Sequence, residues 1–386
     1  MRRPAPQRDA GLRPAQRDRL LELLRRHGRN PNSFLAMYEG PWSLFESQRV
    51  DGGVPYVEAH RTALAWGDPL GAPEDAATLL GEFTAAMRAR GLRVCMVPVQ
   101  EGMARLAMDQ GHAVLKIGEE PVFDLTTWHR PRGDPGKRLR WAMNHARRAG
   151  VEIEEAERGD RDPAVDREIA GVRAAWEAAL GRRPVRSFMR AAPLALAEHK
   201  RIFLARHHGD LVAVLGCVPV HGRDGWYLED LVRLPDSVTG ATELLIVEAL
   251  ERLSARGARF ATLGIAPLRG SDRQMDRRAR WLARLLRVAL ERFDDRYHFA
   301  SLGRFKAKFR PTGWEARYVT FLPPRPSVGL IRAVASVLDP QPAGPAAARG
   351  RATALQAVAI GVGVAIVVLL VRRSSGAGAE DGSAAT

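Results

Sequence analysis

The sequence predicts an α/β (α+β) fold in which two tandem domains are joined by a basic helix and followed by a single C-terminal transmembrane helix. Three observations predict this architecture: a β-loop-α-β unit in residues 226–270, a similar order of elements in residues 64–99, and an apolar run of 18 residues near the C-terminus. A chain of 386 residues holds two domains of ordinary size, and its 46% hydrophobic residues suffice for a core in each.

The unit in residues 226–270 organises the prediction. A strand-like run, Trp226–Leu234, ends in a turn-rich loop, and apolar residues then recur at helical spacing over Leu244–Leu253. Gly257 marks the end of this helix, and a second strand over Arg259–Ile265 ends in a loop rich in proline and glycine. Such a unit normally forms two parallel strands with the helix on one face of the sheet.

The first half of the chain repeats this order. A strand that ends at Leu64–Trp66 leads through a turn cluster to a helix over Asp75–Arg90 and a strand over Val94–Val99. The junction Ala89-Arg-Gly-Leu-Arg is echoed by Ala255-Arg-Gly-Ala-Arg, so we predict an internal duplication. The remaining predicted elements are helices over 18–27, 102–110 and 166–180 and strands over 112–117, 122–125, 201–205 and 211–220.

Changes in composition set the predicted boundaries along the chain. We expect a basic, partly disordered N-terminal segment, two domains separated by the basic helix, and a proline- and alanine-rich linker before the transmembrane helix and a polar tail. The corresponding residues are 1–29, 30–130, 131–150, 151–322, 323–353, 354–371 and 372–386.

The chain is strongly basic. Its formal charge of +15, from 59 basic and 44 acidic residues, favours nucleic acid or an anionic phospholipid membrane as a partner. Much of this charge lies in the linker helix, GKRLRWAMNHARRAG. A helix that only faces solvent and a helix that binds a polyanion are both compatible with this pattern. The candidates for binding tRNA or phosphate are Lys137, Arg138, Arg140, Arg147 and Arg148.

The apolar run Ala354–Val371 predicts a membrane anchor. Gln356 is its only strongly polar residue, and at 1.5 Å per residue a helix of this length spans about 27 Å, enough to cross a hydrocarbon core. We expect a single-pass C-terminal anchor in the cell membrane, with cytoplasmic catalytic domains. Cys95 and Cys217 lie in apolar runs and are expected to be buried and reduced, which suits that compartment.

Common catalytic signatures are absent: the sequence has no Walker loop, no Cys or His spacing suited to a metal and no nucleophile elbow. We therefore expect neither a metal nor a cofactor. Asp230 and Arg233 lie three apart in one predicted strand and should point to opposite faces. Lys306 and Lys308 would share one face of another strand, where an anionic substrate or plain solvent could meet them.

Six segments of the chain resemble the phosphatidylglycerol lysyltransferase family, that is, the cytosolic synthase domain of the multiple peptide resistance factor proteins. They follow the family's order across residues 30–322 and read GDPLGAPED, LKIGEEPVFDL, GKRLRWAMNHARRAG, EDLVRLPDSVTGATELLI, ATLGIAPLRG and GRFKAKFRPTGWEARY. The resemblance implies a tandem pair of acetyltransferase-like (GNAT) domains. It also implies transfer of an aminoacyl group from aminoacyl-tRNA, as co-substrate, to phosphatidylglycerol or a related lipid hydroxyl.

The resemblance also implies roles for individual residues. The family's Asp-x-x-Arg and Lys-x-Lys motifs fall on the catalytic candidates Asp230, Arg233, Lys306 and Lys308. Its Gly-Glu-Glu motif and two glycine-containing segments give the substrate-binding candidates Glu119, Glu120, Gly240, Gly264 and Pro267. Acidic side chains would hold the α-amino group of the aminoacyl moiety, and basic ones the tRNA terminus, the lipid phosphate or the tetrahedral intermediate.

Two other functions fit parts of the pattern. An acyl-CoA-dependent GNAT N-acyltransferase would need a Gln/Arg-x-x-Gly-x-Gly/Ala loop for the pyrophosphate, and the segment from Asp236 to Ala241 supplies only the end of it. The helix N-terminus after that loop could hold an anion, or the loop could simply cap the helix. A non-catalytic, membrane-anchored RNA-binding or scaffold protein would need only the positive charge and the anchor.

Overall fold

The computed structural model of the protein describes residues 11–156, 162–179, 192–276, 299–325, 327, 329–330 and 332–333. Within these residues no helix is both long and apolar enough to cross a bilayer. The predicted anchor, the polar tail, most of the proline-rich linker and the start of the N-terminal segment lie outside the described residues.

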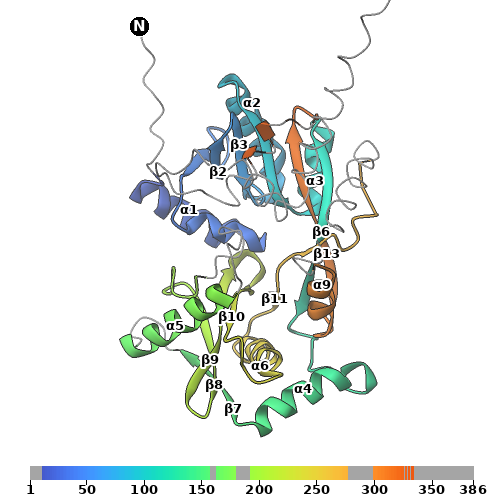
Figure 1. Cartoon of the computed structure of the whole chain (residues 1–386). Helices are drawn as coiled ribbons and strands as arrows, with labels where there is room; N and C mark the ends of the chain where they lie inside the picture. Colours follow the sequence, from blue (N-terminus) through green and yellow to red (C-terminus); the bar gives the residue numbers. More distant parts are fainter. Residues whose placement is uncertain are drawn as a thin grey trace, which may run out of the picture.

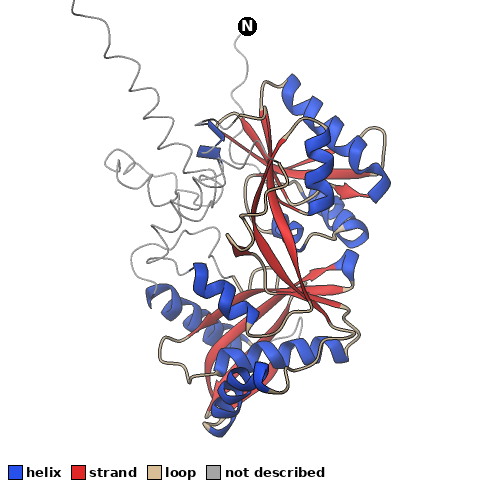
Figure 2. Cartoon of the chain, turned by 90° about the vertical axis from the view of Figure 1, so that its right-hand side faces the viewer, coloured by secondary structure: helices blue, strands red, loops and turns tan. Residues whose placement is uncertain are grey.

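One mixed β-sheet runs through both halves of the described chain, with helices on both of its sides (Figures 1 and 2). Its strands are β1 (Trp42–Glu46), β2 (Gly52–Ala59), β3 (Thr62–Trp66), β4 (Leu70–Gly71), β5 (Arg93–Val99), β6 (Ala113–Asp124), β7 (Val151–Ala156), β8 (Arg201–His207), β9 (Asp210–Val220), β10 (Gly225–Arg233), β11 (Phe260–Thr262), β12 (Ala266–Pro267) and β13 (Gly313–Leu322). They pair in the order β1-β2-β3-β5-β13-β6-β11-β10-β9-β8-β7, while β4 pairs with β2 and β12 with β6.

The helices cover the two halves of this sheet separately. The described α-helices are α1 (Pro14–His27), α2 (Ala76–Ala89), α3 (Glu101–Asp109), α4 (Lys137–Arg148), α5 (Pro163–Ala179), α6 (Ala241–Ala255) and α9 (Phe299–Ala307). Short 3₁₀ turns are η1 (Pro31–Met37), η2 (Pro73–Asp75), η3 (Asp134–Gly136) and η4 (His221–Arg223). The predicted N-terminal helix is confirmed and begins at Pro14.

Alternation along the strands sorts the apolar side chains into separate cores. In β8, Phe203 and Ala205 pack into the core that contains α4 and α6, whereas Ile202 and Leu204 pack against α5 on the opposite face. A third core lies under α2 and α3. A fourth joins the leucines of α1 to η1 and to β9, so the N-terminal helix docks across both halves.

Both predicted β-α-β units are present. In the first, β3 pairs parallel to β5 over five residues, and α2 connects them. In the second, β10 pairs parallel to β11 over three residues, and α6 connects them. Each helix is followed by a glycine with positive φ, Gly91 at 71° and Gly257 at 87°. Helices often end at a residue in this left-handed conformation, which glycine adopts most easily.

Two sequence-based expectations are wrong. Residues 112–125 form the single strand β6 instead of two strands, because pairing with β13 continues across Gly118–Pro121. The segment that contains Lys306 and Lys308 is not a strand: Lys306 lies in the last turn of α9 and Lys308 just beyond it, so the two side chains do not share a strand face. The strand β13 lies between β5 and β6, and it joins the end of the chain to the first half of the sheet.

Candidate functional site

Polar side chains gather where β10 and β11 separate. The two strands pair only over Gly225–Tyr227 and Phe260–Thr262, after which the chain beyond β11 turns toward β6. A β-bulge between Leu228 and Asp230 leaves Glu229 as an extra residue of β10. We call the side chains around this opening the polar centre: Tyr38, Glu120, Lys200, Tyr227, Glu229, Asp230, Thr262, Lys306 and Arg317.

One part of the polar centre is a chain of hydrogen bonds from β13 to α9. Arg317 Nε donates to Glu120 Oε2 at 2.6 Å, and the Thr262 hydroxyl donates to the other oxygen of Glu120 at 3.0 Å. The Gly264 amide donates to Thr262 Oγ1 at 3.1 Å, and Lys306 Nζ donates to the Gly264 carbonyl at 2.8 Å. Arg317 and Glu120 are 1% and 0% exposed, so their ion pair positions the loop after β11 and does not itself face a substrate.

Lys306 is the titratable end of this chain. Lys306 is 7% exposed, and its ammonium group also donates to the Ile265 carbonyl at 2.7 Å. Burial lowers the pKa of Lys306 to about 7, against the opposing effect of Glu120. A neutral lysine that donates both hydrogens to these carbonyls keeps a lone pair, and a protonated one has a third hydrogen to donate. Lys306 can therefore exchange a proton near neutral pH.

Asp230 is buried in an ion pair. Its Oδ2 lies 2.5 Å from Lys200 Nζ, and its Oδ1 accepts a hydrogen bond from the Ala192 amide at 2.9 Å. Lys200 in turn donates to the Ala192 carbonyl at 2.7 Å. Both carboxylate oxygens of Asp230 are thus engaged within the protein. This arrangement favours a positioning role for Asp230 at the bulge over direct contact with a substrate.

Glu229, the extra residue at the bulge, has a hydrogen-bond partner outside this ion pair. The Tyr38 hydroxyl donates to Glu229 Oε2 at 2.7 Å, and Lys200 Nζ lies 5.0 Å from the centre of the Tyr38 ring. Burial and the neighbouring charge of Asp230 raise the pKa of Glu229 to about 8, although Lys200 and the Tyr38 hydrogen bond oppose this. Glu229 is only partly buried, so it remains within reach of a bound molecule.

Tyr227 connects the two parts of the polar centre. Gly264 has a φ of 74°, and a Cβ at this position would lie 2.6 Å from the Tyr227 hydroxyl oxygen. The glycine therefore permits the close approach of this ring to the loop that Lys306 holds. Burial raises the pKa of Tyr227 well above its usual value, with Glu229 and Glu120 contributing.

The other substrate-binding candidate on β6 is Glu119, which stays more accessible than Glu120. Its side chain is 18% exposed and pairs with Lys116 at 2.8 Å and with Arg269 at 3.2 Å. Pro267 belongs to β12, whose register places it opposite Gly118. Gly118 accommodates this strand, because a Cβ there would lie 2.5 Å from the Ala266 carbonyl. Pro267 thus contributes backbone to the site.

Arg233 and Lys308 lie away from the polar centre. Arg233 is exposed at the end of β10 and donates to Ser237 Oγ at 3.1 Å. Lys308 pairs with Glu243 of α6 at 2.7 Å. As expected from their spacing, Arg233 and the buried Asp230 differ in exposure, but the structure gives neither Arg233 nor Lys308 a contact with the other catalytic candidates.

Gly240 is placed by packing between helices. It precedes α6 with a φ of 92°, and a Cβ on it would lie 2.0 Å from the Ala142 carbonyl oxygen of α4. The close approach of the α4 backbone therefore requires glycine at this position, and Gly240 has a packing role between α4 and α6.

The basic helix is confirmed as α4, and its cations fall into two groups. Arg140 donates to the carbonyls of Pro131 and Gly133 at 3.2 and 2.7 Å, and Arg147 pairs with Glu248 of α6 at 2.5 Å. These two arginines fasten the helix to the rest of the chain. The remaining three are exposed on its outer side: Lys137, Arg138 and Arg148.

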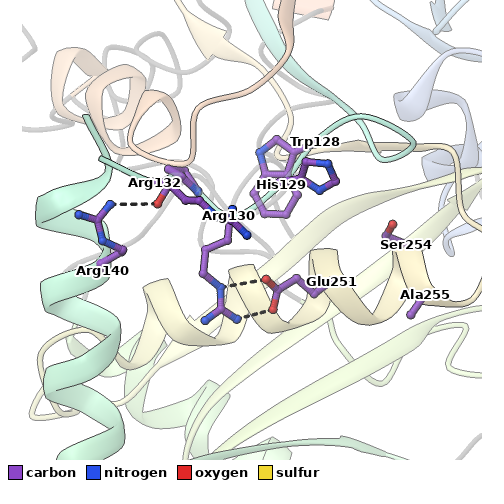
Figure 3. Close-up of a pocket in the computed structure, with 9 residues that line it drawn as sticks. Trp128, His129, Arg130, Arg132, Arg140, Glu251, Ser254 and Ala255 are labelled. Carbon is purple, nitrogen blue, oxygen red and sulfur yellow. Dashed lines mark hydrogen bonds and ion pairs between the residues drawn. The ribbon is translucent and has the colours of Figure 1, made fainter. Parts of the chain in front are cut away.

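An open pocket of about 610 Å³ lies between α4, α6 and the segment that leads from β6 (Figure 3). Arg130 and Glu251 form a two-point ion pair across it, and Arg140 extends toward the same segment. Its lining residues include none from the polar centre. We take the polar centre as the candidate site, because two of its groups, Lys306 and Glu229, have pKa values near neutral.

Six members of the polar centre were not among the sequence-based candidates: Tyr38, Lys200, Tyr227, Glu229, Thr262 and Arg317. Glu229 gave a signal, since it adjoins Asp230 in an otherwise apolar strand. Arg317 lies in the apolar run of β13 and could have been noticed for the same reason. Tyr38 and Lys200 lie outside the matched motifs, and only the packing of η1 and β8 brings them to β10. Among the described residues, no group of three His, Cys, Asp or Glu side chains could hold a metal.

Solved structures share this fold. L-PGS from Bacillus licheniformis superimposes with a TM-score of 0.68 at 20% identity, over 86% of this chain and 99% of that one. A C-terminal domain assigned to a lysylphosphatidylglycerol synthetase from Agrobacterium fabrum gives a TM-score of 0.67 at 21% identity, over 84% and 97% of the two chains. The predicted α/β fold is confirmed, and its sheet is a mixed one that these solved structures share.

Sequence comparison gives the family. The phosphatidylglycerol lysyltransferase of Bacillus subtilis is 23% identical over 310 residues, which are 80% of this chain and 35% of that protein. A lysylphosphatidylglycerol biosynthesis bifunctional protein of Mycobacterium avium is 24% identical over 317 residues, 81% and 27% of the two chains. The chain thus spans about a third of the length of these relatives. The family model described as phosphatidylglycerol lysyltransferase, C-terminal, matches residues 21–321, so the chain belongs to this family.

Proposed function

We propose that this protein is an aminoacyltransferase that moves an aminoacyl group from aminoacyl-tRNA to phosphatidylglycerol or a related lipid hydroxyl. The observation that carries the proposal is the family match over residues 21–321, which includes every residue of the polar centre. The two groups with pKa values near neutral, Lys306 and Glu229, supply the acid–base chemistry that such a transfer needs.

The reaction exchanges one ester for another. The lipid hydroxyl oxygen attacks the carbonyl carbon of the aminoacyl ester, and the bond from that carbon to the terminal ribose oxygen of the tRNA breaks. The proton lost by the lipid hydroxyl is balanced by the proton gained by the ribose oxygen. One group must therefore accept a proton and another must donate one, and both must be in the correct state at the same pH.

Lys306 and Glu229 fit these two roles. With a pKa of about 7, Lys306 is substantially neutral at physiological pH and accepts the proton of the lipid hydroxyl. With a pKa of about 8, Glu229 is largely protonated there and donates to the ribose oxygen. Asp230 and Arg317 are positioning residues, since Asp230 holds Lys200 at the bulge and Arg317 holds Glu120 beneath the Lys306 loop. Glu119 is the more exposed carboxylate of the two on β6, and it meets the cationic α-amino group by exchanging its pair with Arg269, the longer of its two ion pairs.

The remaining sequence-based expectations form part of the same proposal. The two β-α-β units represent a tandem pair of GNAT-like domains, the basic surface attracts the tRNA, and an anchor over residues 354–371 keeps the enzyme at the cytoplasmic face of the cell membrane. The acyl-CoA alternative is less well supported because the segment from Asp236 to Ala241 supplies only the end of the pyrophosphate-binding loop. A purely scaffolding role gives no account of two groups with pKa values shifted toward neutrality.

Reconstitution tests this function directly. Purified protein is incubated with phosphatidylglycerol vesicles and a pool of aminoacyl-tRNAs, and the extracted lipids are analysed by mass spectrometry. We expect an aminoacylated lipid that requires charged tRNA and is lost in Lys306→Met but not in the matched Lys308→Met. Product formed from acyl-CoA instead would establish the alternative enzyme, and tRNA binding without any product would establish the non-catalytic role.

A further inference from the structure

The outer side of α4 carries an exposed aromatic pair between cations. Trp141 is 57% exposed, the largest exposure of any large hydrophobic side chain among the described residues. Its ring stacks on His145, one helical turn away, with ring centres 5.4 Å apart and an angle of 13° between the planes. We define the outer face of α4 as Lys137, Arg138, Trp141, His145 and Arg148.

This face is free of the interactions that hold the helix in place. The opposite side of α4 is buried against α6 through Leu139, Met143 and Ala146. Arg140 and Arg147, on the flank, have partners within the protein. In the described part of the chain, the three cations of the outer face have no carboxylate partner, and Arg148 donates only to the Asn144 carbonyl of its own helix.

We infer that the outer face of α4 docks on an anionic lipid bilayer. A helix face that presents a tryptophan between lysine and arginine side chains suits a membrane interface, since the indole sits at headgroup level and the cations meet anionic lipids. The helix lies at the edge of the molecule (Figure 1).

The rest of the sequence supports a membrane as the occupant. The apolar run Ala354–Val371 is the predicted anchor, and a chain anchored there is held beside a bilayer surface. Docking through α4 adds a second contact with the bilayer. The anchor alone would only tether the folded part of the chain, whereas two contacts also fix its orientation relative to the membrane. The inference goes beyond the proposed function and does not rest on it, because contact with lipid can be measured whether or not the protein transfers an aminoacyl group.

The test measures the environment of Trp141 in vesicles. The full chain is combined with vesicles of phosphatidylcholine or of phosphatidylcholine with increasing phosphatidylglycerol, containing brominated lipid as a fluorescence quencher. Because the chain has eight tryptophans, the signal of Trp141 is taken as the difference between wild type and Trp141→Phe. We expect this signal to shift to shorter wavelength and to be quenched only when phosphatidylglycerol is present.

Charge variants show whether the outer face makes the contact. In Arg138→Ala/Arg148→Ala, the concentration of phosphatidylglycerol-containing vesicles that gives half-maximal quenching of Trp141 should rise about thirty-fold, because each of the two lost cations contributes roughly five-fold to binding at an anionic surface. The matched control is Arg88→Ala, an exposed arginine of α2, which should leave quenching unchanged. Circular dichroism verifies that each variant is folded.

Three results would overturn the inference. The first is an absence of quenching in phosphatidylglycerol vesicles. The second is equal quenching in pure phosphatidylcholine, which would mean that the anchor alone brings Trp141 to the lipid. The third is a Trp141 signal that responds to tRNA and not to lipid, which would assign the outer face of α4 to RNA.

Discussion

The two β-α-β units have the same connectivity but differ at the strand ends. In the first unit, all five residues of β3 pair with β5 and are buried, and none of them is ionisable. In the second unit, β10 pairs with β11 over three residues only and then departs from it at the bulge. The strand β10 of the second unit carries Glu229, Asp230 and Arg233, whereas β3 of the first unit carries no charged residue.

The two units therefore contribute different features to the molecule, an apolar core in the first and a cluster of titratable groups in the second. A closed pair of strands has no space for polar side chains between its members, so the first unit contributes a core under α2 and α3. The pairing of β10 with β11 ends at Tyr227, next to the bulge between β10 and β9, and titratable groups from β6, α9 and β13 gather there. The candidate site therefore coincides with a local irregularity of the second unit.

The largest effect is expected on breaking the buried ion pair of the second unit. Asp230→Ala leaves Lys200 buried without its carboxylate, which should lower the free energy of unfolding by about 3–5 kcal/mol in urea titrations. The double variant Lys200→Met/Asp230→Leu makes the second unit as apolar as the first, and it should recover most of this stability while transfer activity stays lost. A double variant as unstable as Asp230→Ala would mean that the ion pair is not the cause.

A smaller effect tests the packing of α4 against α6 in the second unit. Gly240→Ala combines a φ of 92° with a Cβ 2.0 Å from the Ala142 carbonyl, whereas Gly257→Ala has a similar φ of 87° and no atom within 4 Å of its Cβ. Gly257→Ala should cost about 1–2 kcal/mol from backbone strain alone. Gly240→Ala should cost about 1–3 kcal/mol more, because α4 must move. Equal losses in thermal unfolding would show that α4 does not pack there as described.

The smallest effect is expected at the edge of the second unit. Lys308→Met breaks a partly exposed pair with Glu243, so the free energy of unfolding should fall by less than about 1 kcal/mol, and lipid aminoacylation should remain close to that of the wild type. Kinetic assays that found Lys308→Met as inactive as Lys306→Met would restore the role that the Lys-x-Lys motif implied and would move the site toward α6.

Much of the fold could be predicted from local pattern. The apolar spacing in α6, the glycines after α2 and α6, and the basic composition of α4 each identify their element, because each depends on residues close in sequence. The segment from Phe305 to Phe309 alternates apolar and basic residues in a way that predicts a strand, but it forms the end of α9. There Lys306 gains two carbonyl partners in the loop after β11, a tertiary interaction that the alternation does not reveal.

The site could be predicted only in part. Asp230, Glu120 and Lys306 were identified through their motifs, but their environments depend on partners far along the chain. Glu120 is paired with Arg317, 197 residues away, and Glu229 receives its hydrogen bond from Tyr38, 191 residues away. The bulge that separates β10 from β11 follows from the register with β9, so the division into positioning and proton-transferring groups becomes visible only in the folded sheet.

The pH dependence of transfer tests the central claim most directly, namely that the opening of the second unit holds the acid and the base. Initial rates of lipid aminoacylation are measured from pH 6 to 9 and corrected for hydrolysis of the aminoacyl-tRNA. Activity requires Lys306 deprotonated, which is lost below about pH 7, and Glu229 protonated, which is lost above about pH 8. We therefore predict a bell-shaped profile with its maximum between these values, and Glu229→Gln should alter the alkaline limb while Lys308→Met retains both limbs. An unchanged alkaline limb in an active Glu229→Gln enzyme would contradict the assignment.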